Sequence, residues 1–388
     1  AMKKSLPDVQ DMIGALIALP SVSCTDPSRD LGNLEVIDLL ADWAESIGFK
    51  VEIDRFLPNK ANLIATLGTF SSKETPGGLI LSGHTDTVPC DPELWMSDPF
   101  VATVRDDRIY GLGSADMKSF MALALSAANQ LKDQPLREPL VLVATADEES
   151  SMSGARALLA RNQKLGRYAV IGEPTGLRPI RMHKGVAMAS ITVHGRSGHS
   201  SDPELGANAI DGMHAVLSEL ITIRNEMRAQ YWSPHFRVGH PTLNLGSIHG
   251  GDNPNRICGH CQTQIDIRPL PGMDVAALMS ELGERLAQVI ESYPGLRLEI
   301  TRLSEGIPAF ETSTESEIVR FAEDVTASAS GSAAFGTEAP FFSALGSEAI
   351  VMGPGHIDQA HQPNEYLPLN HIGPCISILE QLIGKFCL

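Results

Sequence analysis

The sequence has no apolar run long enough to cross a membrane, few cysteines and a shortage of basic residues. Spanning a bilayer takes roughly 20 consecutive apolar residues, and no stretch of the chain approaches that length. The stretch AMKKSLPDVQDM carries two lysines but no apolar core for a secretory signal, so we expect a cytoplasmic protein. Six irregularly spaced cysteines in 388 residues favour a reducing compartment over a disulfide framework.

Acidic residues outnumber basic ones, 47 to 30, which gives a formal net charge of −17. A surface of that sign repels phosphate backbones and anionic lipids, so we expect neither nucleic acid nor a membrane as a partner. The length of 388 residues leaves room for two domains, since a domain typically has about 100–200 residues.

Two hydrophobic patterns divide the chain. Up to residue 183, helical periodicity alternates with short apolar runs, which is typical of helices on both faces of a mostly parallel sheet. Between 184 and 301, strands of alternating polarity surround two long helical stretches, which indicates an antiparallel sheet with helices on one face. The first pattern then resumes. We therefore predict an α/β catalytic domain, residues 1–183 and 302–388, with an α+β domain, 184–301, inserted into it.

Histidine and carboxylate side chains follow several predicted strands. LILSGHTDTVP ends one strand with His84 and Asp86, and positions two apart lie on the same side of an extended chain. Other strands end just before Glu148 and Glu149 and just before Glu173. In an open α/β sheet, ligands bind at the carboxyl ends of the strands. We therefore expect these side chains to meet at one edge.

Two further candidates come from loops. Asp116 precedes a predicted helix in GLGSADMK, and His361 follows a glycine-rich turn in GPGHIDQAH. Asp116 alone could be a helix N-cap, and the pair His84 and Asp86 could cap a strand. Together, so many acidic and imidazole groups need a compensating cation. A pair of divalent metals supplies it, and ligands without cysteine suit zinc or cobalt.

Other motifs argue against alternative kinds of site. CGHC, residues 258–261, resembles half a zinc site, but no second CxxC or matching histidine pair follows, so we interpret these cysteines as structural thiols. GLGSAD lacks the third glycine of a dinucleotide site, and the absence of G-x-S-x-G argues against a serine hydrolase.

The segments GHTDTVP, GLGSADMK, ATADEES, IGEPTG, SGHSS and GPGHIDQAHQPNEY resemble, in order, the signature segments of the dinuclear zinc amidohydrolases and exopeptidases. The resemblance spans almost the whole chain. It implies a dizinc exopeptidase-like mixed sheet flanked by helices, with an inserted ferredoxin-like lid that forms a homodimer. Within the family, ATADEESSMSGAR, DIRPLPGM and GTEAPFF look most like members that hydrolyse N2-acetyl-L-ornithine to L-ornithine and acetate in arginine biosynthesis.

The resemblance also implies the metal ligands. His84 and Glu173 would hold one zinc ion, Glu149 and His361 the other, and Asp116 would bridge the two; cobalt is an alternative metal.

The resemblance assigns three further catalytic roles. Asp86 would hydrogen-bond to the far nitrogen of His84, and Glu148 would be the general base. His199, in the inserted domain, would stabilise the oxyanion, unless it is a loop histidine facing solvent.

Substrate recognition needs groups for a carboxylate and for an amine. Arg268 and Lys184 are candidates for the substrate α-carboxylate, with Asn255 assisting. Glu338 is the candidate for the ornithine ammonium, the alternative being a solvated turn residue.

Two other functions are open. The same chemistry could act on another N-acyl-amino acid, such as N-acetylcitrulline or succinyl-diaminopimelate, or on a dipeptide. A binding protein could keep the sheet without catalysis, but it would be expected to lack the base or the bridging ligand. Glu148 and Asp116 are both present, which favours an enzyme.

Overall fold

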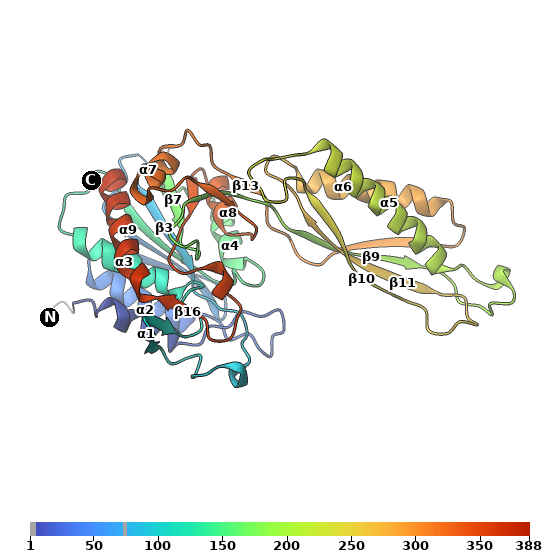
Figure 1. Ribbon diagram of the computed structural model, residues 1–388, viewed down its shortest axis with the longest axis horizontal. Helices are drawn as coiled ribbons and strands as arrows, with labels where there is room; N and C mark the ends of the chain where they lie inside the picture. The colour runs from blue at the N-terminus through green and yellow to red at the C-terminus, as the bar shows by residue number, and fades with distance from the viewer. Residues whose placement is uncertain (1–4, 73–75) are drawn as a thin grey trace. The chain divides into compact units, whose positions relative to one another are not determined.

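The computed structural model describes residues 5–72 and 76–388 (Figure 1). The chain forms two compact units. The first comprises residues up to Arg181 together with Thr312–Gly331 and Thr337–Leu388; the second comprises Met182–Glu311 and Ser332–Gly336. The predicted inserted segment, 184–301, therefore lies within the second unit, which also takes in residues 302–311 and 332–336.

The first unit is built on a mixed sheet with strand order β1-β2-β6-β3-β7-β15-β8. Its strands are β1 (Lys50–Leu57), β2 (Lys60–Leu67), β3 (Leu79–His84), β6 (Leu140–Thr145), β7 (Tyr168–Ile171), β15 (Glu348–Val351) and β8 (Ile180–His183), and β13 (Phe310–Glu311) and β14 (Gly331–Ala333) pair with β8. The central strands β6, β3, β7 and β15 are parallel, whereas β1, β2 and β8 join antiparallel. The expectation of a mostly parallel sheet holds only for this centre.

Helices cover both faces of this sheet (Figure 1). The helices are α1 (Val9–Ile17), α2 (Leu34–Ser46), α3 (Lys118–Leu131), α4 (Ser153–Arg161), α7 (Glu317–Thr326), α8 (Ala339–Ala344) and α9 (Ile372–Cys387). On one face α3 packs against α1, α2 and α9, and on the other α4 packs against α8. A small separate sheet contains β4 (Thr103–Arg105), β5 (Arg108–Tyr110) and β16 (Tyr366–Pro368).

The central strands explain why both faces are covered. The residues of β3 and β6 are buried along their whole length, because Leu, Ile and Val point to both sides. Burial on both faces favours near-continuous hydrophobic strands of this kind over alternating ones.

The second unit is an antiparallel sheet with two long helices. Its elements are β9 (Ala187–His194), α5 (Ala209–Gln230), β10 (Thr242–Gly250), β11 (His260–Arg268), α6 (Val275–Glu291) and β12 (Arg297–Arg302), with strand order β10-β11-β9-β12. Alternate residues of β9 and β11, such as Ile191 and Ile265, pack with α5 and α6 in one core. The predicted α+β pattern, and with it the predicted fold class, is confirmed.

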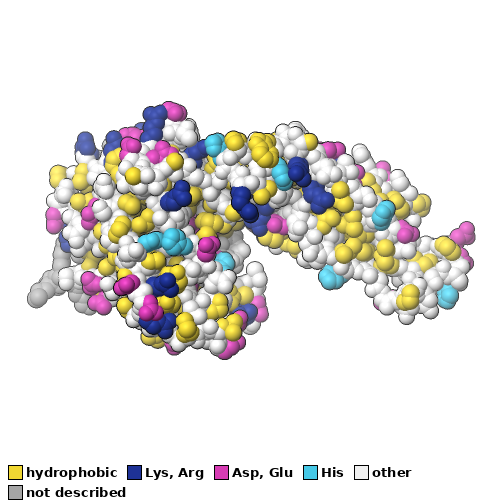
Figure 2. All heavy atoms as spheres, viewed as in Figure 1, with side chains coloured by type: hydrophobic (Ala, Val, Ile, Leu, Met, Phe, Trp, Pro, Cys, Tyr) yellow, Lys and Arg dark blue, Asp and Glu magenta, His cyan; other side chains and the backbone are white. Residues whose placement is uncertain are grey.

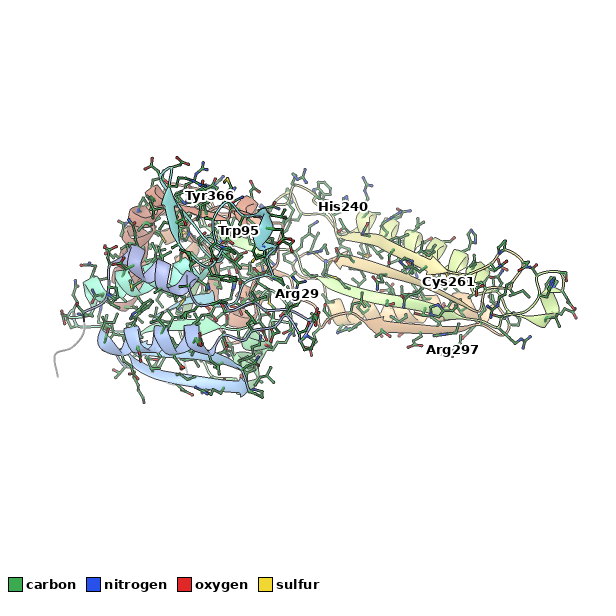
Figure 3. All side chains as sticks on the ribbon, turned by 90° about the horizontal axis from the view of Figure 1, so that it is seen from below. Arg29, Trp95, His240, Cys261, Arg297 and Tyr366 are labelled. Atoms are coloured by element: carbon green, nitrogen blue, oxygen red, sulfur yellow. The ribbon has the colours of Figure 1, made fainter. Side chains whose placement is uncertain are left out.

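The CGHC cysteines are part of that core. Cys261 lies on β11 (Figure 3), and Cys258 precedes the strand; both thiols are buried. No group of potential metal ligands in the described residues includes a cysteine.

The surface is mixed in character. On the face drawn in Figure 2, hydrophobic side chains and charged side chains of both signs are interspersed. Among the described residues, no helix combines the length and the apolar character needed to cross a membrane.

Candidate dinuclear metal centre

The carboxyl ends of three neighbouring parallel strands carry the candidate ligands. His84 is the last residue of β3, Glu148 and Glu149 follow β6, and Glu173 follows β7. Because β6, β3 and β7 are adjacent and parallel, their carboxyl ends meet at one edge of the sheet. The topology of the sheet therefore brings these side chains together, as we expected.

One group of potential ligands contains His84, Asp116 and Glu173, all buried. Nε2 of His84 lies 3.0 Å from Oδ1 of Asp116 and 3.9 Å from Oε1 of Glu173. Helix α3 begins at Lys118, and Met117, not Asp116, occupies its N-cap position. The alternative of Asp116 as a helix cap is therefore wrong.

A second group contains Asp116, Glu149 and His361. Nε2 of His361 lies 2.9 Å from Oε2 of Glu149 and 3.6 Å from Oδ2 of Asp116. The two carboxylate oxygens of Asp116 thus face different histidines, Oδ1 towards His84 and Oδ2 towards His361. This is the arrangement a carboxylate needs in order to be shared by two metal ions.

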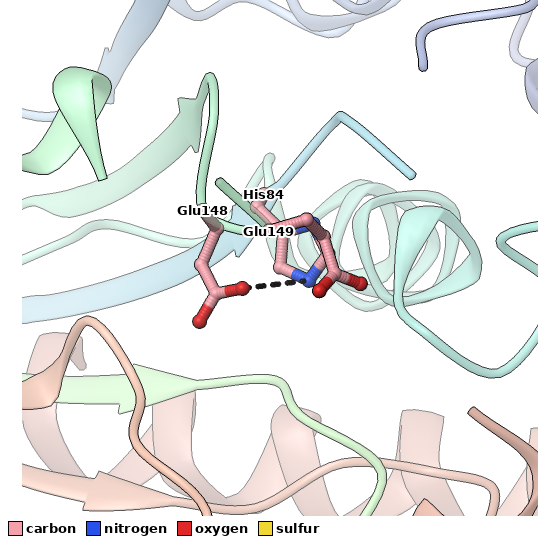
Figure 4. A group of neighbouring side chains, drawn as sticks. All are labelled: His84, Glu148 and Glu149. Atoms are coloured by element: carbon pink, nitrogen blue, oxygen red, sulfur yellow. Dashed lines mark ion pairs between the residues drawn. The ribbon is translucent and has the colours of Figure 1, made fainter. Parts of the chain in front are cut away.

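Glu148 lies beside these groups (Figure 4). Its Oε2 is 3.9 Å from Nε2 of His84, and it forms a third group with His84 and Glu149. Among these contacts, the carboxylate of Glu149 lies against His361, whereas that of Glu148 lies against His84.

Burial and mutual repulsion shape the electrostatics of the cluster. Burial, reinforced by nearby carboxylates, raises the pKa of Glu148 and of Glu173 well above the usual range and that of Glu149 to about 7. Burial opposes protonation of His84, but hydrogen bonds with Asp116 and Asp86 raise its pKa well above the usual value. The hydrogen bond with Glu149 raises the pKa of His361 to about 9.

The residues present fit divalent metal ions. Oε1 of Glu173 is buried and has no hydrogen-bond partner within residues 5–72 and 76–388, although it points towards Nε2 of His84. An unpaired buried carboxylate oxygen is costly unless a cation meets it. A donor set of imidazole nitrogens and carboxylate oxygens is one that zinc and cobalt accept.

The contacts of Asp86 differ from the expectation. The nearest partner of His84 Nδ1 is the backbone carbonyl of Asp86, at 3.0 Å, and the carboxylate Oδ1 is 3.5 Å away. The carboxylate instead accepts the backbone N–H groups of Glu148 and Glu149, each at 3.1 Å. Asp86 therefore holds the turn after β6 as well as the ring of His84.

Glu338 is buried, and the alternative of a solvated turn is wrong. It lies at the start of α8, and its Oε2 accepts the Thr145 hydroxyl at 2.8 Å. Its Oε1 is buried and finds no hydrogen-bond partner in the described part of the chain, and burial raises the pKa of Glu338 to about 7.

The other sequence candidates lie on the second unit. His199 is exposed, with Nδ1 2.7 Å from the Ser201 hydroxyl, and Asn255 lies in an exposed loop. Nζ of Lys184 donates to the carbonyls of Val238 and His240, at 2.7 and 2.6 Å.

Arg268 has a partner as well. Its Nε donates to Asp266 at 3.0 Å. Both cations expected to read the substrate carboxylate thus have partners within their own unit.

Sequence reasoning missed two buried residues near the centre. Glu365 accepts the backbone N–H groups of Ala115 and Asp116, and Lys60 pairs with Asp30 and with Asp147, the residue before Glu148. The only signal for Glu365 was its place at the end of GPGHIDQAHQPNEY, and Lys60 had none.

Comparison with known proteins shows the class. The family model of peptidase family M20/M25/M40 matches residues 80–385, and the chain belongs to this family. The predicted resemblance to the metal-dependent amidohydrolases and exopeptidases is thereby confirmed.

Curated relatives show which members of this family the chain is similar to. The chain is 45% identical to the acetylornithine deacetylase of Photorhabdus laumondii over 100% of this chain and 99% of the relative. It is 45% identical to that of Aliivibrio fischeri, over 98% and 99%, and 44% identical to that of Pectobacterium atrosepticum, over 100% of both. These relatives and the family identify the chain as a metal-dependent amidohydrolase.

Solved structures share the fold at low identity. An M20 metallo-carboxypeptidase from Sulfolobus solfataricus is 18% identical, with a TM-score of 0.73 over 97% of this chain and 99% of that one. A dinuclear metal-binding M20 peptidase from Bacillus subtilis is 13% identical, with a TM-score of 0.69 over 96% of both chains.

Proposed function

We propose that the protein hydrolyses N2-acetyl-L-ornithine to L-ornithine and acetate, a step of arginine biosynthesis in the cytoplasm. The observation that carries hydrolysis is the pair of ligand groups that share Asp116, with the additional carboxylate of Glu148 beside them. The choice of substrate is supported by full-length relatives at 44–45% identity that are named acetylornithine deacetylase.

We assign two zinc ions to the cluster, with cobalt as the alternative. His84 and Glu173 would hold one ion, Glu149 and His361 the other, and Asp116 both. Bound there, the ions would polarise the amide carbonyl and lower the pKa of water towards neutrality.

Glu148 moves the proton in this mechanism. Its carboxylate takes a proton from the water that attacks the acetyl carbonyl. When the carbon–nitrogen bond breaks, Glu148 delivers this proton to the nitrogen, because an amide nitrogen cannot leave as an anion. Asp86 supports both carboxylates by accepting the N–H groups of Glu148 and Glu149.

We assign substrate recognition to four residues. Buried Glu338, with its unpaired Oε1, would meet the ornithine ammonium. Arg268 and Lys184, with Asn255, would read the α-carboxylate, which requires each cation to exchange a partner it has within its unit.

The oxyanion donor would come from a second chain. We assign His199 to this task in a homodimer formed through residues 184–301, so that the lid of one chain completes the site of its partner. Within the described residues, β10 lies at one edge of its sheet, and an edge strand can pair with a strand of a second chain.

A turnover panel tests the proposal. The zinc-loaded and the cobalt-loaded protein are each assayed with N-acetylornithine, N-acetylcitrulline, N-acetylmethionine, succinyl-diaminopimelate and a dipeptide. The highest kcat/KM is expected for N-acetylornithine. A higher value for another member of the panel would reassign the substrate, and no turnover of any member would refute hydrolysis.

A further inference from the structure

Glu365 is a buried carboxylate that the mechanism above does not use. It is 1% exposed. Its Oε1 accepts the backbone N–H groups of Ala115 and Asp116, at 2.8 and 2.9 Å, and its Oε2 accepts that of Gly113 at 3.1 Å. The carboxylate therefore fixes the backbone of the loop that leads into Asp116.

The same residue belongs to the segment that carries His361. The backbone carbonyl of Glu365 accepts the Gly111 N–H at 3.1 Å, and the next residue, Tyr366, pairs with Tyr110 between β16 and β5. Two loops that are far apart in sequence, 110–116 and 361–366, are thus joined through Glu365. One of them supplies Asp116 and the other His361.

Other ligands are fixed in a different way. His84 ends β3 and Glu173 follows β7, and the two strands pair directly in the central sheet. The contact between Asp116 and His361, in contrast, joins two loops, and Glu365 bonds to the backbone of one while belonging to the other.

We propose that Glu365 is a positioning residue that sets Asp116 against His361 and thereby controls binding of the second metal ion, the one assigned to Asp116, Glu149 and His361. The inference rests on the metal assignment of the proposed function. Residues behind metal ligands typically contribute about 10–100-fold to metal affinity.

The matched variants are Glu365→Gln and Glu317→Gln. Glutamine keeps the shape of Glu365 but has one acceptor oxygen, and its NH₂ would face a backbone N–H. Glu317 is a control of the same chemistry in the same unit, where it accepts the Tyr168 hydroxyl and pairs with Lys385 at the surface. Glu365→Asp keeps both acceptor oxygens on a shorter side chain, and it serves if the glutamine variant does not fold.

Metal-free full-length protein is titrated with Co²⁺, followed by calorimetry and by the cobalt absorption spectrum. We expect Glu365→Gln to weaken the second equivalent by about 10–100-fold and the first by much less, with Glu365→Asp intermediate and Glu317→Gln unchanged. Wild-type affinity for both equivalents, equal weakening of both, or unfolding of both Glu365 variants without metal would overturn the proposal. A wild-type protein that binds two cobalt ions but does not hydrolyse N-acetylornithine would refute the proposed function alone.

Discussion

In the first unit Lys60 is buried between Asp30 and Asp147, whereas in the second unit Arg285 meets Glu219 and Glu226 near the surface. The two units also differ in where other charged side chains lie. The first unit buries carboxylates around its sheet edge, and Glu173, Glu338 and Glu365 are nearly inaccessible. Ion pairs of the second unit, such as Arg256 with Asp252 and Arg297 with Glu299, lie at the surface around an apolar core.

This contrast shows that buried and exposed ion pairs have different effects on the protein. A buried ion pair gains little net stability over an apolar replacement, but it is costly to break, because one charge is left without a partner. An exposed pair is solvated whether or not it forms. Buried charges in the first unit therefore act on the geometry of the turns that carry the candidate ligands. We expect substitutions of charged residues to have large effects there and small effects in the second unit, except at His199 and at the proposed substrate-binding residues Arg268, Lys184 and Asn255.

Glu148→Gln gives the largest expected effect. The carboxylate is the proposed base and not a ligand, so turnover should fall by roughly 10²–10⁴ while the metal content stays at the wild-type level. Metal analysis and kinetics are measured on the same samples, with Glu149→Gln as the control that should lose metal. If Glu148→Gln loses metal in proportion to activity, the roles of the two glutamates are exchanged.

Lys60→Met tests the buried pair. Asp147 has a left-handed φ of 60°, and its carbonyl accepts the N–H groups of Ser150, Ser151 and Met152 in the turn that carries Glu148 and Glu149. Removing the ammonium leaves Asp30 and Asp147 without their buried cation, and the free energy of unfolding should fall by about 3–5 kcal/mol.

Denaturant unfolding of the metal-free protein measures this loss. Lys60→Arg keeps the charge and should recover part of the stability. A loss of stability as small as that for a surface ion pair would mean that water reaches the ammonium of Lys60.

His199→Ala tests whether the second unit contributes to catalysis. Loss of an oxyanion donor should lower turnover by roughly 10²–10³. If His199 serves the partner's site, mixing this variant with Glu148→Gln under subunit exchange should recover about 25% of wild-type activity, since half of the dimers are mixed and each of these has one intact site.

Two results would contradict the composite site. A monomer in solution excludes it directly. A fully exchanged mixture that stays inactive would place His199 in its own chain's site, and the metal assignment would be unaffected by either result.

Glu338→Gln should produce a smaller effect that depends on the substrate. A lost pairing with a cation in a dry pocket should cost about 2 kcal/mol, or roughly thirtyfold in kcat/KM, on N-acetylornithine. The neutral side chain of N-acetylmethionine should show much less change, and the ratio of the two kcat/KM values is the measurement. Equal losses on both substrates would give Glu338 a structural role instead.

Arg285→Met should have the smallest effect. Its partners Glu219 and Glu226 stay solvated without it, so the melting midpoint should shift by about 2–4 °C at most, as measured by calorimetry. A loss of stability as large as the one expected for Lys60→Met would remove the contrast between the two units.

The sequence predicted elements and sites to different extents. Helical periodicity predicted helices up to residue 183 and after 301, and alternation predicted strands between 184 and 301. These patterns arise because elements such as α2, α7, β9 and β11 pack one face against a core. Strand-end motifs identified which side chains meet at the sheet edge, because strand order and direction decide what lies there.

The remaining contacts depend on tertiary structure. The three partners of Glu365 are backbone N–H groups 249–252 positions earlier in the chain, and backbone groups carry no sequence signal. The same holds for Lys184, whose ammonium is satisfied by two carbonyls. Burial of Glu338 against Thr145 likewise depends on how α8 packs near the end of β6.

The strand order β7-β15-β8 has a consequence for synthesis on the ribosome. Strand β15 lies between two strands that precede it by more than a hundred residues in the chain, and the whole of the segment Met182–Glu311 is translated before it. Domains generally fold as units while the chain emerges. The inserted unit can therefore fold first. The sheet that bears the candidate ligands is completed later, because the position beside β7 is filled only when Glu348–Val351 has left the exit tunnel.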